Sequence, residues 1–252
     1  DQVPDGALVI FSAHGVSKQV YEEARRRLVY ADATCPLVSK VHREVERPVA
    51  AGRTVLLIGH AGHPEVEGTM GQVPAGWVRL IETIEDAERV EVPDPRHVAY
   101  ATQTTLSAMD TAAIIARLRQ RFPYMQGPRR EDICYATTNR QQAIAAVAAH
   151  ADLVWVIGAP NSSNSLRLVE VAQRAGCPRA RLLQDANGFD WEELTGVRRL
   201  GLSAGASAPD HLLRGVIDRL RERFAVELRE MQLVEENVTF RLPPIPRLAR
   251  AV

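Results

Sequence analysis

The sequence predicts an α/β protein with small parallel sheets. Short runs rich in Val, Leu and Ile recur along the chain, and each is followed by a polar turn and then by a longer helical pattern. This alternation occurs about seven times, as expected for successive βα units with parallel strands. With 252 residues, the chain is long enough for one to three compact domains.

The composition is that of a globular protein without a nucleic-acid-binding or membrane-binding surface. Hydrophobic residues make up 46% and charged residues 25%, and 31 basic residues balance 31 acidic ones. Such a balance argues against a basic surface for nucleic acid or a membrane. The longest apolar runs, residues 55–58 and 153–157, are far shorter than the roughly 20 residues of a membrane span. Three cysteines without a close pair favour a reducing compartment, so we expect a cytoplasmic protein.

The elements of the first half follow from apolar runs and from helix start and stop signals. Proline suits the first turn of a helix, so Pro36 is expected to begin one and Pro48 to end or kink it. In order, the expected elements are a strand at 7–11, a helix at 19–27, a strand at 29–31, a helix at 36–47 and a strand at 54–58.

The second half repeats the pattern. Ile133 and Cys134 are expected to open a strand-to-helix turn, and alternation at 234–240 predicts a last strand before a proline-rich tail. The other expected strands are at 98–102, 153–157 and 199–202. The expected helices are at 107–121, 139–149 and 208–224, with one more that follows residue 164 and ends near residue 174. The predicted segments are the remainder of a first domain at 1–36, a second α/β domain at 37–128, a third at 129–225, and a strand and tail at 226–252 that pack on another domain.

Polar side chains that favour anions gather where helices begin. In α/β sheets, ligands bind outside the carboxyl ends of the strands. Residues 161–164 and 203–207 each place hydroxyl groups and backbone N–H groups at such a position, which favours a phosphate or diphosphate. His14 and His63 add two imidazoles that can carry positive charge. Each cluster, taken alone, is also ordinary turn and helix-cap chemistry.

A carboxylate, two threonines and two cysteines complete the candidate residues. Glu65 is either a first-turn helix carboxylate or a proton donor. Thr104 and Thr105 either hold a hydroxyl group of a ligand or cap the following helix. Cys35 and Cys134 are both expected where a strand ends and a helix begins, so both could face one centre. Cys177 lies in a loop expected at the opposite end of the sheet and is interpreted as a bystander.

The candidate residues belong to longer motifs. These are Phe11-Ser-Ala-His-Gly-Val16, Asp32-Ala-Thr-Cys-Pro-Leu37, Gly62-His-Pro-Glu-Val-Glu-Gly-Thr-Met-Gly-Gln72, Thr102-Gln-Thr-Thr-Leu106, Ile133-Cys-Tyr-Ala-Thr-Thr-Asn-Arg140, Asn161-Ser-Ser-Asn-Ser165 and Ala204-Gly-Ala-Ser-Ala-Pro209. Taken together, these motifs resemble those of the IspH/LytB family of 4-hydroxy-3-methylbut-2-enyl diphosphate reductases. The resemblance runs from the first residues to Glu235-Glu-Asn-Val-Thr-Phe240.

The resemblance implies three small parallel-sheet α/β domains arranged pseudo-threefold around a central iron–sulfur cluster. It implies an oxidoreductase of the non-mevalonate isoprenoid pathway that reductively dehydroxylates (E)-4-hydroxy-3-methylbut-2-enyl diphosphate to isopentenyl and dimethylallyl diphosphate. The electron donor would be ferredoxin or flavodoxin. Matched by motif, Glu65 would deliver protons, Thr104 would contact the substrate hydroxyl, and Cys35 and Cys134 would ligate a [4Fe–4S] cluster. The residues implied to hold the diphosphate are His14, His63, Ser162, Ser163, Asn164 and Ser207.

The chain also departs from the family pattern. The family begins with about sixty residues that are not seen here, and these carry the third cluster cysteine and one further diphosphate histidine. We therefore expect a fragment with an incomplete first domain. Leu166 stands where a polar residue is expected. The alternative to the reductase is a truncated, cluster-free α/β remnant that binds diphosphate without catalysis.

Overall fold

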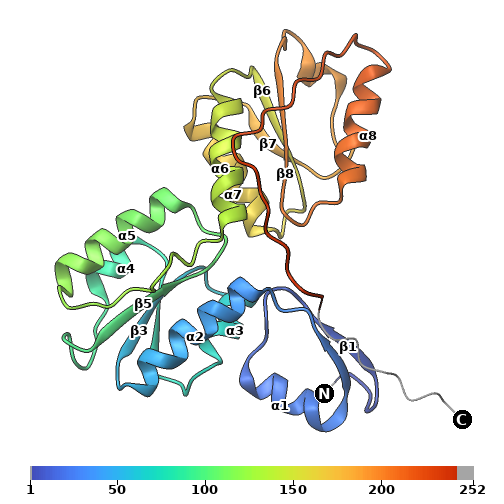
Figure 1. Cartoon of the computed structure of the whole chain (residues 1–252). Helices are drawn as coiled ribbons and strands as arrows, with labels where there is room; N and C mark the ends of the chain where they lie inside the picture. Colours follow the sequence, from blue (N-terminus) through green and yellow to red (C-terminus); the bar gives the residue numbers. More distant parts are fainter. Residues whose placement is uncertain (1, 243–252) are drawn as a thin grey trace, which may run out of the picture. The chain divides into compact units, whose positions relative to one another are not determined.

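The computed structural model describes residues 2–242, and their strands form three separate parallel sheets (Figure 1). The first sheet pairs β1 with β2, and the others have the orders β4-β3-β5 and β7-β6-β8. The predicted α/β class with small parallel sheets is confirmed. The strands are β1 (Leu8–Phe11), β2 (Val29–Asp32), β3 (Thr54–Ile58), β4 (Val78–Ile81), β5 (Val98–Thr102), β6 (Leu153–Ile157), β7 (Ala180–Leu183) and β8 (Leu200–Ala204).

Helices follow most of the strands, as the βα pattern requires. They are α1 (Lys18–Arg27), α2 (Pro36–Ala50), α3 (Pro64–Met70), α4 (Ile84–Arg89), α5 (Ala108–Arg121), α6 (Tyr135–Ala148), α7 (Ser163–Arg174), α8 (Asp210–Arg221) and the short 3-10 helix η1 (Trp191–Leu194). The described chain forms two compact units. The first comprises residues 2–104, 108–133 and 238–242, and the second comprises 105–107 and 134–237.

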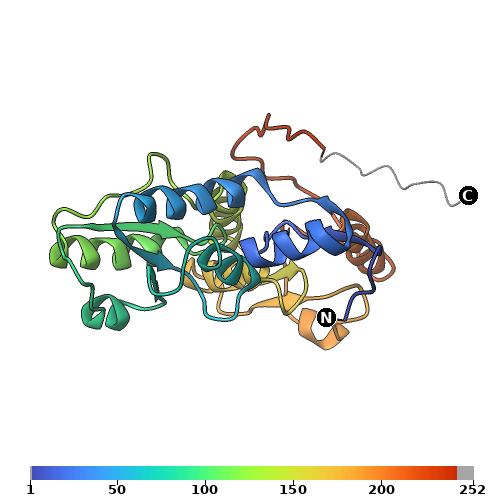
Figure 2. The ribbon, with the colours of Figure 1, turned by 90° about the horizontal axis from the view of Figure 1, so that it is seen from below.

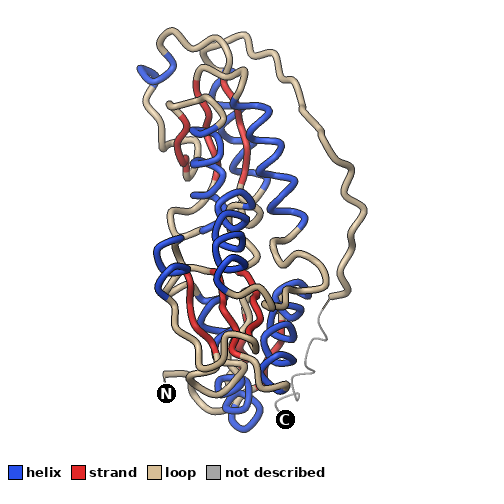
Figure 3. Tube along the Cα trace, turned by 90° about the vertical axis from the view of Figure 1, so that its left-hand side faces the viewer, coloured by secondary structure: helices blue, strands red, loops and turns tan. Residues whose placement is uncertain are grey.

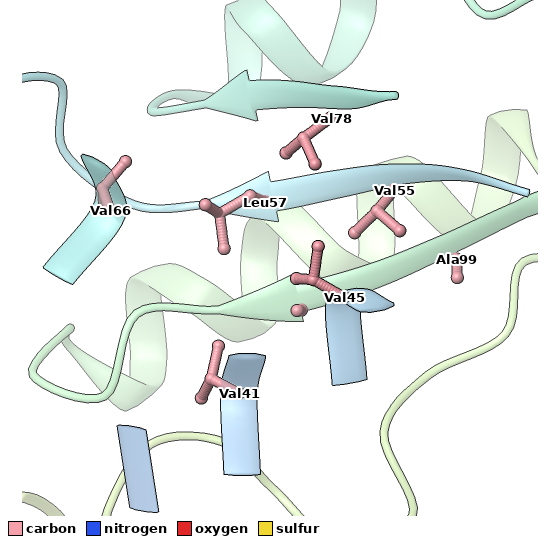
Figure 4. Close-up of a cluster of buried hydrophobic side chains, with 8 residues drawn as sticks. Val41, Val45, Val55, Leu57, Val66, Val78 and Ala99 are labelled. Atoms are coloured by element: carbon pink, nitrogen blue, oxygen red, sulfur yellow. The ribbon is translucent and has the colours of Figure 1, made fainter. Parts of the chain in front are cut away.

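In the first unit, the central strand β3 is buried on both faces. Val55 and Leu57 pack against Val41 and Val45 of α2 (Figure 4). Helices α2 and α5 lie on opposite faces of this sheet (Figure 2). Alternating strand side chains therefore reach different helices, which explains why β3 reads as a continuous apolar run.

The second unit repeats this arrangement around β6. Val154 and Val156 belong to a core with Leu168 of α7, whereas Trp155 and Ile157 belong to a core with Val216 of α8. Cys177 is 1% exposed within the first of these cores. Its burial agrees with its interpretation as a bystander of any chemistry.

The β1–β2 sheet is less covered than the other two. Phe11 is buried and stacks on Tyr30, with ring centroids 5.2 Å apart. Leu8 and Ile10 on the same strand are 51% and 70% exposed. This sheet carries the loop of His14 at the end of β1 and leads to Cys35 after β2.

Three sequence predictions about elements are wrong. The helix end expected at residue 47 is wrong, since α2 continues through Pro48 to Ala50, because a proline in the last turn removes only one intrahelical hydrogen bond. A kink at Pro48 stays a prediction. No strand immediately precedes Cys134, although Cys134 does begin a helix. The strand expected at 234–240 is absent; residues 225–242 form no regular element (Figure 3), and the tail beyond 242 lies outside the described residues.

Strands β4 and β7 were not expected from the sequence. Each is only four residues long and contains an arginine, Arg79 or Arg181, so neither forms an unbroken apolar run. The domain boundaries at 36/37 and 128/129 stay a prediction. Among residues 2–242, no helix combines the length and the apolar composition that crossing a bilayer requires.

Candidate functional site

Two histidine rings meet in the first unit. His14 lies in the exposed turn after β1, and His63 is the N-cap of α3. Their ring centroids are 5.4 Å apart with the planes nearly perpendicular. Nδ1 of His63 accepts a hydrogen bond from the Glu65 N–H at 3.2 Å, so Nε2 carries the hydrogen of the neutral ring.

The environment of His63 favours the neutral ring at pH 7, so of the two states that the sequence leaves open the uncharged one is preferred. Burial lowers the pKa of His63 to about 4, and the charges of His14 and His60 lower this pKa further. A neutral ring still donates one hydrogen bond from Nε2. An anion bound beside this ring favours its protonation.

Glu65 is 1% exposed in the first turn of α3 and is paired with Thr104. The Thr104 N–H donates to Oε1 at 2.7 Å, and the Thr104 hydroxyl donates to Oε2 at 2.9 Å. Burial raises the pKa of Glu65 to about 7; the two hydrogen bonds oppose this rise and the Asp132 charge adds to it. Near neutral pH, the carboxyl therefore exists in both protonation states, as general acid catalysis requires.

Cys35 and Cys134 occupy equivalent local positions. Each is the N-cap of a helix, α2 or α6, and each thiol is free and half-buried. The Cys35 N–H donates to the Ala13 carbonyl at 3.0 Å, which places Cys35 beside the loop of His14. Sγ of Cys134 accepts the Thr137 N–H at 3.2 Å and lies 3.0 Å from the Thr137 hydroxyl.

The two thiols fit the role of iron ligands in part. They are soft sulfur donors without a disulfide, and backbone N–H contacts to sulfur such as that of Thr137 are typical of iron–sulfur sites. Within residues 2–242, no group of three or more His, Cys, Asp or Glu side chains is placed to hold a metal ion.

In the second unit, the start of α7 is a polar cluster. Ser162 is the N-cap, and its hydroxyl accepts the Ser165 N–H at 3.3 Å. The Thr105 hydroxyl donates to the Ser163 hydroxyl at 3.3 Å. Asn164 is 6% exposed, and neither its Nδ2 nor its Oδ1 has a hydrogen-bond partner in the described chain. Leaving such a group unpaired costs about 1–3 kcal/mol, which a ligand would recover.

The turn that carries Ser207 lies next to this helix start. The Gly205 N–H donates to the Ile157 carbonyl at 2.8 Å, so the turn after β8 adjoins the end of β6. A Cβ atom at Gly205 would lie 3.6 Å from Nδ2 of Asn164. Ser207 itself is exposed.

The predicted site residues thus form two groups. His14, His63, Glu65 and Thr104 gather in the first unit, and the serines with Asn164 gather in the second. The prediction overlooked Thr137 as a partner of Cys134. Its spacing of three residues after an N-cap is the signal that could have identified it.

A polar helix start with an unpaired buried amide, and a buried carboxyl whose pKa is raised to about 7, suit an enzyme that acts on a phosphorylated substrate. A family model described as LytB protein matches residues 1–221. The "4-hydroxy-3-methylbut-2-enyl diphosphate reductase" of Phenylobacterium zucineum is 58% identical over 244 residues, covering 96% of this chain and 77% of the relative. The protein of the same name from Gluconobacter oxydans is 56% identical, covering 96% and 74%.

Solved structures agree with these sequence matches. The E-1-hydroxy-2-methyl-but-2-enyl-4-diphosphate reductase of Plasmodium falciparum superposes with a TM-score of 0.90 at 36% identity, covering 96% of this chain and 76% of that one. A structure of (E)-4-hydroxy-3-methyl-but-2-enyl diphosphate reductase, described as the terminal enzyme of the non-mevalonate pathway, gives 0.60 at 31% identity, covering 88% and 78%. The chain belongs to the LytB protein family. The predicted family and its oxidoreductase class are therefore confirmed.

Proposed function

We propose that the chain catalyses the reductive dehydroxylation of (E)-4-hydroxy-3-methylbut-2-enyl diphosphate to isopentenyl and dimethylallyl diphosphate. Membership of the LytB family and the reductase names of its relatives support this reaction. The residue pair that best supports it is Glu65 with Thr104, because loss of a hydroxyl group needs a proton and this buried carboxyl can supply one.

The residues proposed to bind the diphosphate carry hydrogen-bond donors suited to phosphate oxygens. In the first unit, Nε2 of His63 and the ring of His14 donate to phosphate oxygens. In the second unit, Ser162, Ser163 and Ser207 offer hydroxyl groups, and the unpartnered amide of Asn164 donates through Nδ2. Backbone N–H groups at the start of α7 add the anion preference of a helix N-terminus.

Proton delivery follows from the hydrogen bonds of Glu65. In the ionised state, the Thr104 hydroxyl donates to Oε2. When Glu65 is protonated, this hydrogen bond can reverse, so that the carboxyl donates to Thr104 and the threonine hydroxyl donates to the substrate hydroxyl. The Oε2 proton passes to the Thr104 oxygen while the threonine's own hydroxyl proton passes to the departing oxygen, which leaves as water as its bond to carbon breaks.

Cys35 and Cys134 are the residues of this chain that would hold a [4Fe–4S] cluster. When bound, the cluster supplies the two electrons of the reduction, received from a ferredoxin or flavodoxin. The Thr137 N–H donates to the Cys134 sulfur, an interaction of the kind that tunes cluster potentials. The cytoplasmic location is proposed with this function.

The test compares two glutamates in the same helical turn. Glu65→Gln keeps the size of the side chain but removes its transferable proton, and Glu67→Gln alters an exposed neighbour. Turnover is measured after anaerobic reconstitution with iron and sulfide, using a one-electron dye as reductant. We expect Glu65→Gln to lower turnover by roughly 10²–10⁴-fold and Glu67→Gln to leave it within twofold.

Two outcomes would contradict the proposal. A loss below tenfold for Glu65→Gln would remove the proton-donor role. An unmodified chain that binds inorganic pyrophosphate but never turns over after reconstitution would instead match the cluster-free, diphosphate-binding remnant. Iron and sulfide content per chain distinguishes these results from failed reconstitution.

A further inference from the structure

The second half of the Gly62–Gln72 motif has no role in the proposed reaction, yet it makes specific contacts. Gln72, which directly follows the C-cap of α3, is 8% exposed. Its Nε2 donates to the Val16 carbonyl at 2.8 Å and to the Gly68 carbonyl at 2.7 Å. Both amide hydrogens are therefore used, and they join α3 to the loop that carries His14.

Two glycines let the same loop approach the backbone of α3. A Cβ atom at Gly68 would lie 3.2 Å from the Gly15 carbonyl oxygen, and one at Gly71 would lie 2.3 Å from Cβ of Ser17. The Lys18 N–H donates to the Gly71 carbonyl at 3.1 Å. A larger residue at Gly71 would displace the loop, because that spacing is shorter than any ordinary carbon contact.

The other side of the loop is also fixed. Gly15 has a φ of +74°, and a Cβ atom there would lie 2.8 Å from Cε1 of His42 on α2. The loop between β1 and α1 is thus held between α2 and α3. His14 stands on this loop and His63 is the N-cap of α3, so the two segments that these contacts join carry the two rings.

We propose that Gln72 is a positioning residue that holds the His14 loop on α3, with Gly68 and Gly71 as the surface that receives it. The inference rests on the proposed function in one respect, namely that His14 and His63 bind a diphosphate. Without the Gln72 bridge, two backbone carbonyls lose their donor and the loop can move away from α3. The His14–His63 pair then no longer presents a fixed geometry to the anion.

The test uses Gln72→Met, which keeps the length of the side chain and removes both donors. Gln173→Met in the second unit is the matched control, because Nε2 of Gln173 also donates to a backbone carbonyl, that of Ala180 at 2.9 Å. Calorimetry with inorganic pyrophosphate measures binding. We expect Gln72→Met to weaken binding about tenfold, equivalent to about 1.4 kcal/mol, and Gln173→Met to change it less than twofold.

Imidazole NMR signals report the geometry without any activity. Gln72→Met should shift the signals of His14 and His63 and leave that of His97, which bonds to Asp94, unchanged. Gly71→Ala should also shift the imidazole signals of His14 and His63. Gly215→Ala on α8 is its control, since the nearest atom to an added Cβ there is 3.9 Å away.

The outcomes separate this inference from the proposed function. Unchanged signals of His14 and His63 in Gln72→Met, together with pyrophosphate affinity within twofold, would overturn the inference. Shifted signals with weakened binding support it even if Glu65→Gln leaves turnover intact. If the unmodified chain does not bind pyrophosphate, the diphosphate role fails, and the histidine signals alone decide whether Gln72 positions the loop.

Discussion

Burial of Glu65 couples its protonation to the stability of the first unit. The pKa of Glu65 is about 7 in the folded chain, against an ordinary 4.5, because desolvation outweighs the two hydrogen bonds from Thr104. A raised carboxyl pKa favours folding in the protonated state. The contribution of Glu65 to the free energy of unfolding is fully present below pH 4.5 and is lost as the pH rises through 7.

Glu65→Gln should therefore change how stability depends on pH. The substituted chain lacks this titration, so its free energy of unfolding relative to the unmodified chain should rise by about 3 kcal/mol between pH 4 and pH 8. Urea unfolding at a series of pH values measures the difference. The exposed Glu67→Gln should show no such trend, and a flat difference for Glu65→Gln would show that the carboxyl is solvated.

Asn164 differs from Glu65, because its side-chain amide is buried and has no hydrogen-bond partner in the described chain. Asn164→Leu removes the unpaired amide at similar volume, a change that is often neutral or stabilising. We expect stability without ligand to stay equal or to rise by about 1 kcal/mol, while pyrophosphate affinity falls at least tenfold. Thermal unfolding with and without pyrophosphate measures both. A loss of stability without any loss of affinity would make Asn164 a structural residue.

At the scale of elements, the sequence predicts central strands well and contacts between distant segments poorly. β3, β5 and β6 are buried on both faces, so each reads as an apolar run. The hydrogen bond from Thr104 to Glu65 joins residues 39 positions apart, and no local sequence pattern predicts it. The location of polar residues at helix starts could be predicted, because parallel strands bring their carboxyl ends to one edge of a sheet. Their protonation states could not, since these depend on burial.

Helix α3 illustrates how packing substitutes for length. Its seven residues are too few to form a stable helix in isolation. Val66, at 2% exposure, anchors it in the core of the first unit, where its side chain fits against Gly59. The position of Glu65 on this helix consequently depends on an apolar neighbour.

Val66→Ala should weaken both packing and the burial of Glu65. We expect a loss of about 2 kcal/mol in the free energy of unfolding and a fall of the Glu65 pKa toward its ordinary value as water enters. Carboxyl NMR titration and urea unfolding measure the two effects. Val20→Ala, at a 44% exposed site on α1, is the control and should change neither. An unaltered Glu65 pKa in a destabilised Val66→Ala chain would show that the burial of Glu65 does not depend on the packing of Val66.

At the scale of the whole molecule, each unit carries its own three-stranded sheet and its own core residues. β3 and β6 occupy equivalent central positions, with parallel neighbours on both sides. Val55 and Val154 are both fully buried in these strands and belong to separate cores. The chemistry that the proposed function needs is likewise divided, with the proton donor in the first unit and the unpartnered amide in the second.

Val55→Ala and Val154→Ala form a matched pair that tests whether the two cores are energetically separate. Each should cost about 1–3 kcal/mol through lost apolar burial and incomplete closure of the cavity. Hydrogen exchange should accelerate in β3, β4 and β5 for Val55→Ala, and in β6, β7 and β8 for Val154→Ala, because effects at sites without shared partners remain independent. Equal loss of protection in both sheets from either substitution would mean that the units unfold as one cooperative body. In that case, weakening the second core would also expose Glu65 to water. Pyrophosphate binding at Asn164 would likewise stabilise the folded first unit, in which the Glu65 carboxyl is buried.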